Sequence, residues 1–178
     1  AGRFVSLRLD MASESEQKSV PIILDEDDEV LYNQCSDLMI KTIQTAAKHN
    51  FGNNANKIVS LINGASLSFF RELLVIIRMK TAFQEARCQL AQGRSVVFSL
   101  QTTGETYLDC ETKGIINRVF RLLDFLHSLS PHDAWSSLRE EWAELTLPDR
   151  SVLDLIIDEF GQECVAEISG RSKACVRS

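Results

Sequence analysis

The stretch best suited to chemistry is a polar tract that follows a short apolar run. Gln101, Thr102, Thr103 and Gly104 come directly after the β-prone segment 95–100. Backbone N–H groups, hydroxyls and a glycine at a strand tip can approach a phosphate closely, and open α/β sheets place ligands at such tips. This tract could therefore contact a phosphate. An ordinary strand-to-helix turn is the alternative, because one polar turn with a glycine is a weak motif.

Cysteine and histidine chemistry has little support. The five cysteines are widely spaced and include no C-x-x-C pair, which is typical of a reducing compartment and not of a disulfide framework or zinc knuckle. Cys88 and Cys164 fall at apolar periodic positions, so we expect both to be small buried hydrophobic residues. The three histidines show no metal-ligand spacing, and we assign no metal.

Charge is unevenly distributed along the 178 residues. The net charge is −6, yet residues 41–94 carry eight basic and two acidic side chains. Such a segment can bind a polyanion. Alternatively, it can be a solvated helical surface whose cations balance acidic residues nearby. The composition is that of a soluble globular protein, and we expect no apolar stretch of membrane-spanning length. The chain lacks an initiator Met, and we expect it to be part of a longer protein.

The first half of the chain is predicted to be mainly helical. Five consecutive acids, Asp25–Glu29, precede a helical apolar pattern. They predict the start of a helix, because carboxylates complement its positive end. A short helix is expected to end at Gly64. Residues 66–92 then form two helices that meet near Met79 and Lys80, and Gly93 terminates the second.

The second half is predicted to mix helices and strands. The expected helices span 114–129, 131–145 with Ser130 as N-cap, and 152–160. Asp149 or Ser151 is expected to start the last of these, and Gly161 to stop it. Trp135 and Trp142 share a face of the second of these, which indicates packing and not base stacking. The apolar runs 96–100 and 165–169 are expected to be parallel strands, because helices separate them. The predicted fold class is α/β, helix-rich, with a short parallel sheet.

Two blocks resemble one family. The segment RSVVFSLQTTGET, residues 94–106, is similar to the GKxVVIGLQSTGEA pattern of the Strawberry notch family of superfamily two helicase-like ATPases. The segment LPDRSVLDLIIDEFGQECVAEISGR, residues 147–171, is similar to that family's LPxNxLDxLIDxLGGPxxVAEMTGR. The order of a helix, Lys80, a second helix, Gly93 and a strand also resembles the entry into a second RecA-like lobe.

The resemblance implies a division of the chain. Residues 1–24 would hold strands that leave the first lobe, and 25–79 a helical inter-lobe connector. Residues 80–178 would begin a RecA-like second lobe with a helical insert at 107–147. ATP and Mg²⁺ would belong to the parent protein, because the sequence holds no G-x-x-x-x-G-K-[ST] loop, acidic metal-binding box or Arg-rich closing motif.

The resemblance also implies a function. The parent would be an ATP-dependent helicase or translocase, and hence a hydrolase, that acts on nucleic acid, DNA rather than RNA, in transcription or chromatin regulation. It would work in the nucleus, or alternatively in an organelle, with the rest of its own chain and chromatin or transcription proteins as partners. The implied nucleic-acid contacts are Gln101, Thr102, Thr103, Gly104, Gly170 and Arg171, with Arg94, Lys80 and Lys173 as weaker candidates.

A non-catalytic module is the alternative function. A degenerate helicase-like protein could use the helix that carries Trp135 and Trp142, together with its acidic ends, to dock protein partners. A phosphate loop and an Arg-rich motif in flanking sequence would separate the two hypotheses.

Overall fold

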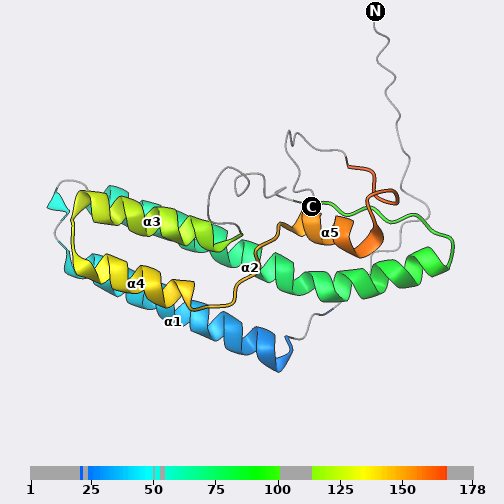
Figure 1. The fold of residues 1–178 in the computed structure, drawn as a ribbon, viewed down its shortest axis with the longest axis horizontal. Coiled ribbons are helices and arrows are strands. Elements are labelled where there is room, and N and C mark those ends of the chain that lie inside the picture. The colour runs from blue at the N-terminus through cyan, green and yellow to red at the C-terminus, as the bar shows by residue number, and fades with distance from the viewer. Residues whose placement is uncertain (1–20, 22–23, 50, 53–54, 101–113, 168–178) are drawn as a thin grey trace, which may run out of the picture.

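The described residues form an arrangement of helices. The computed structural model describes residues 21, 24–49, 51–52, 55–100 and 114–167. Within them no strand occurs, and the chain order of the helices is shown in Figure 1. The helices are α1 (Glu26–Lys48), α2 (Ala55–Ala91), α3 (Ile116–Leu129), α4 (Asp133–Ala143) and α5 (Val152–Phe160).

The predicted α/β fold, with its RecA-like parallel sheet, is wrong. Residues 94–100 and 165–167 form neither helix nor strand. Burial alternates along the first segment, with Phe98 and Leu100 packed on the core and Val97 89% exposed. The side chains of residues 95–100 thus alternate between solvent and the core, but among the described residues this segment packs against helices and not beside another strand. A strand also needs a partner for its backbone groups. Residues 168–169 and most of 1–24 lie outside the described residues.

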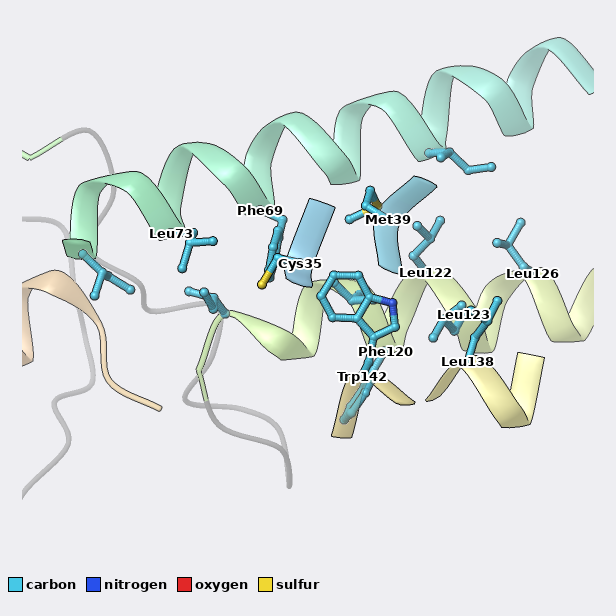
Figure 2. Packing of buried hydrophobic residues seen from close by; sticks show 14 of the residues in the cluster. Cys35, Met39, Phe69, Leu73, Phe120, Leu122, Leu123, Leu126, Leu138 and Trp142 are labelled. Carbon is cyan, nitrogen blue, oxygen red and sulfur yellow. The ribbon is translucent and has the colours of Figure 1, made fainter. Parts of the chain in front are cut away.

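The first four helices form a bundle. α1 and α3 each pack against both α2 and α4, and successive helices run in opposite directions (Figure 1). At the centre, the fully buried Phe69 and Trp142 rings meet edge to face with centroids 5.3 Å apart (Figure 2). The Trp142 indole N–H donates to Thr42 Oγ1 at 3.3 Å, so its polar atom is satisfied within the core.

Helix α1 begins as its acidic run predicts. Asp25 is the N-cap, and its carboxylate accepts a hydrogen bond from the Asp28 N–H at 2.8 Å. The other acids lie in the first turn, where they complement the helix dipole. Cys35, Thr42 and Ala46 are buried at the predicted helical spacing.

Helix α2 is one continuous helix of 37 residues. The predicted stop at Gly64 and the predicted joint near Met79 and Lys80 are both wrong. An interior glycine costs about 1 kcal/mol relative to alanine. Burial of Ile62 and Phe69, one on each side of Gly64, favours the helix by more than this cost. The predicted domain boundary at 79/80 stays a prediction.

Helix α2 is also long and apolar enough to cross a membrane, by length and composition alone. From the sequence we expected no apolar stretch of membrane-spanning length. One such helix is weak evidence for a membrane span, since a helix in the core of a soluble protein passes the same test. In the structure α2 packs against α1, α3 and α5.

The caps of the later helices are partly as predicted. Ser151 caps α5, since its hydroxyl accepts from the Asp154 N–H at 3.2 Å. The predicted N-cap of α4 is wrong, because His132 Nδ1 accepts from the Ala134 N–H at 3.1 Å. Ser130 instead ends α3, and its carbonyl accepts the Trp135 indole N–H at 2.9 Å.

Candidate functional site

The predicted nucleic-acid contacts fall largely beyond the part of the chain that the structure describes. Gln101, Thr102, Thr103, Gly104, Gly170, Arg171 and Lys173 all lie outside the described residues. The segments that lead into them are described, and these are residues 95–100 and 165–167.

Both leading segments line one cavity. It has a volume of about 920 Å³, and its walls include residues 95–100 and 164–167 together with Leu153, Ile156 and Phe160 of α5. Figure 1 shows both segments close to α5. Leu100 and Glu167 are the last described residues before the two predicted contact tracts, and both line the cavity. The described residues that lead into both tracts therefore line the same cavity.

Three phenylalanine rings join the two blocks to α2. Phe83 of α2 lies 5.6 Å from Phe160 and 6.3 Å from Phe98, between ring centroids. Phe98 and Phe160 lie 6.0 Å apart. Arg87 of α2 also pairs with Glu159 of α5. The blocks that resemble one family thus share one packing cluster, although residues 107–146 separate them in sequence.

Gly93 sets the direction in which the chain leaves α2. Its φ is +74°, which favours glycine. The Gly93 N–H donates to the Leu90 carbonyl at 2.9 Å, and the Arg94 N–H donates to the Gln89 carbonyl at 3.1 Å. This pair of bonds is a Schellman cap, and it confirms the predicted stop. The exposed Arg94 guanidinium donates to Gln89 Oε1 at 2.8 Å.

Gly114 joins the bundle to the segment that precedes α5. Its φ is +83°, and a Cβ added there would lie 2.4 Å from the Pro148 carbonyl oxygen and 2.7 Å from Asp149 Cα. Backbone surrounds this position, so no side chain can move aside to accommodate a methyl group. The close approach holds the start of α3 against residues 148–149.

Lys80 is engaged in contacts within the protein. Its ammonium donates to Asp25 Oδ2 at 2.9 Å and to Asp28 Oδ2 at 2.8 Å. The hydrogen bond from Lys80 lowers the pKa of Asp25, and the hydrogen bonds to both carboxylates raise the pKa of Lys80. Lys80 thus ties α2 to the start of α1, which weakens its candidacy as a phosphate contact.

The two tryptophans pack inside the bundle, as their spacing predicts. Trp135 and Trp142 are both almost completely buried. Their indoles are inaccessible, so neither a base nor a protein partner can dock on them.

The prediction for two cysteines is wrong. Cys88 and Cys164 are exposed. Cys88 lies on a face of α2 that a short window of sequence cannot assign, and Cys164 lies in the turn that follows α5. Cys35 is buried, and burial raises the pKa of its thiol to about 12.

The residues present do not fit ATP with Mg²⁺. In the described ranges, no group of three or more His, Cys, Asp or Glu side chains is arranged to hold a metal ion. The full sequence holds no phosphate loop. We therefore derive no catalytic step from this chain.

The described residues form a four-helix bundle, and α5 packs against its helix α2. No family of known proteins, no curated protein and no solved structure matches the chain. The Strawberry notch resemblance stays a prediction that rests on the residues of the two blocks.

A second hollow was missed from sequence. It lies between α2 and α3, and its lining includes Lys57, Arg118 and Arg121. The basic composition of residues 41–94 indicated one of these cations, Lys57. The rest comes from α3, and only the packing of α3 on α2 brings the cations together.

Proposed function

We propose that this chain is a segment of a Strawberry notch-like ATP-dependent helicase or translocase. The parent protein would act on nucleic acid, DNA rather than RNA, in transcription or chromatin regulation in the nucleus. ATP and Mg²⁺ would bind elsewhere in the parent. The observation that carries the proposal is the common cavity that described residues of both family-like blocks line.

This proximity supports the proposal for a physical reason. Residues that grip one stretch of nucleic-acid backbone must reach the same surface, although they come from distant parts of the chain. Leu100 and Glu167, the last described residues before the two tracts, line one cavity. Two chance similarities would have no reason to be neighbours. The proposal does not depend on a parallel sheet.

The proposed contacts divide by chemistry. Thr102 and Thr103 offer hydroxyl donors, and Gly104 and Gly170 allow a phosphate to approach the backbone closely. Arg171 offers a guanidinium that can bind two phosphate oxygens at once. Gln101 adds an amide donor. Phosphate contacts position a protein on nucleic acid and do not specify sequence.

A salt titration of binding tests these roles. Fluorescence anisotropy would follow labelled single-stranded DNA and RNA of several sequences as they bind the complete chain. We expect Arg171→Ala to weaken binding similarly for all sequences and to reduce the salt slope by about one. Thr102→Ala with Thr103→Ala should weaken binding in the same uniform way. Arg78→Ala, at an exposed position of α2, is the matched control.

Two results would oppose the proposal. An unchanged salt slope in Arg171→Ala would remove the phosphate contact. If the threonines only cap a helix, Thr103→Ala would lower stability by about 1 kcal/mol and leave affinity unchanged. A thermal melt beside the titration separates these outcomes.

The alternative function, a helical interaction module, needs a different surface from the one expected. Trp135 and Trp142 are buried, so they cannot carry it. The hollow between α2 and α3 is the observation that keeps this second candidate open.

A further inference from the structure

The α2–α3 groove is an open hollow of about 720 Å³ on the bundle. It is lined by residues of both helices, namely Lys57, Ser60, Leu61, Gly64, Ala65, Ser68, Asn117, Arg118, Arg121 and Phe125. Gly64 and Ala65 leave space on the α2 side. A Cβ built on Gly64 has nothing within 4 Å.

Large apolar side chains face solvent on both walls of the groove. Leu61 of α2 is 42% exposed and Phe125 of α3 is 40% exposed. Burial of apolar surface contributes roughly 25 cal/mol per Å². A partner that covers both side chains would therefore gain free energy that the isolated bundle does not.

The charge of the groove is opposite to that of the chain. Its lining includes Lys57, Arg118 and Arg121 and no Asp or Glu, whereas the whole chain has a net charge of −6. Arg118 donates to the buried Glu72 carboxylate at 3.2 Å behind the groove. Lys57 and Arg121 lie exposed at the surface. The groove thus complements an acidic partner.

We propose that the α2–α3 groove binds an amphipathic helix of another protein, which presents large apolar side chains flanked by carboxylates. Two antiparallel helices leave a trough into which the side-chain ridge of a third helix can pack. The apolar side chains would cover Leu61 and Phe125 and fill the space beside Gly64. The carboxylates would meet Lys57 and Arg121. This site is independent of the proposed nucleic-acid contacts.

A nucleic-acid strand fits the groove less well. Its phosphates would find the cations, and one base could stack on Phe125. The space beside Gly64 and Ala65 would nevertheless stay unfilled, and Leu61 would gain little cover. A helical peptide satisfies both the apolar and the charged residues.

Filling the groove is the sharpest test. The probe is a labelled synthetic helical peptide with leucines and glutamates on one face, followed by anisotropy with the complete chain. We expect Gly64→Leu to weaken binding roughly tenfold or more, because it takes the space of one buried apolar side chain. The fold should survive, since leucine favours helix over glycine. Asn63→Leu, exposed and outside the groove, is the control and should bind normally.

Charge reversal and a competitor complete the test. Lys57→Glu with Arg121→Glu should weaken binding of the glutamate peptide and strengthen binding of its lysine counterpart, whereas Arg78→Glu should change neither. Equal binding of a sequence-scrambled peptide would overturn the proposal. So would binding of a single-stranded oligonucleotide that Gly64→Leu abolishes, because the groove would then be a polyanion site. Nucleic-acid binding through Arg171 should be the same in Gly64→Leu, so the two proposals fail separately.

Discussion

The four-helix bundle and the α5 unit bury aromatic side chains to different extents. Here the α5 unit means residues 79–100 and 152–167. In the bundle, Phe69 and Trp142 are completely buried and meet edge to face. In the α5 unit, Phe83, Phe98 and Phe160 also meet ring to ring, but each is only partly buried. Four helices surround the two rings in the bundle, whereas the rings of the unit pack between α2, α5 and the non-helical segment 94–100.

This difference suggests that the bundle provides most of the stability and that the α5 unit leads into the proposed binding residues. The bundle supplies most of the fully buried side chains, so we expect it to contribute most of the free energy of unfolding. The family-like blocks lie in the more open unit. Regions with few buried apolar contacts open most readily, and binding segments are often drawn from them.

Truncating one ring in each region should reveal the contrast most strongly. Trp142→Ala should lower the free energy of unfolding by about 3–5 kcal/mol, because it leaves a large cavity among fully buried side chains. Phe160→Ala should cost only about 1–2 kcal/mol, because its ring is partly exposed in the folded protein. Urea unfolding measures both values. Equal losses would mean that the two regions are packed alike.

The joint between the two regions should be nearly as sensitive. Gly114→Ala should lower the free energy of unfolding by about 2–3 kcal/mol, because the methyl group meets the Pro148 carbonyl and the residue has a positive φ. Gly64→Ala, where a Cβ meets nothing within 4 Å, should instead raise it by up to about 1 kcal/mol. A loss at position 64 that equals the loss at 114 would contradict the close approach.

Loss of the Lys80–Asp25 ion pair is expected to have a smaller effect on stability. The folded pKa of Asp25 is lowered, chiefly by the hydrogen bond from Lys80, so the unfolded chain binds the proton more tightly. The contribution is present above the unfolded pKa of about 4 and is lost as the pH falls through the folded pKa. Lys80→Gln should therefore melt below the native protein at pH 6 and approach it in acid. A gap that widens in acid would reverse the sign.

Local signals in the sequence predicted much of the helical structure. Asp25, Ser151, Gly93 and Gly161 begin or end helices as expected, because a cap depends on a few neighbouring residues. Gly64 shows the limit of such signals. Its helix continues because distant side chains pack on either side of it, and these contacts are not visible in a local window.

The strand prediction failed for a related reason. The apolar run 96–100 indicates β-prone side chains, although Val97 among them is 89% exposed. It does not indicate whether a second strand lies beside them, since pairing is a long-range property. The same limit applies to the sites. The two blocks could be found from sequence, but their shared cavity and the α2–α3 groove arise only from helix packing.

Hydrogen exchange of the complete chain, with and without single-stranded DNA, tests the central claim most directly. The claim is that nucleic acid binds at residues 101–104 and 170–171 and not on the bundle. We expect DNA to slow amide exchange in peptides that contain residues 101–104 and 170–171, while α1, α3 and α4 exchange as before. Protection confined to the α2–α3 face, or no protection at saturating DNA, would contradict the claim.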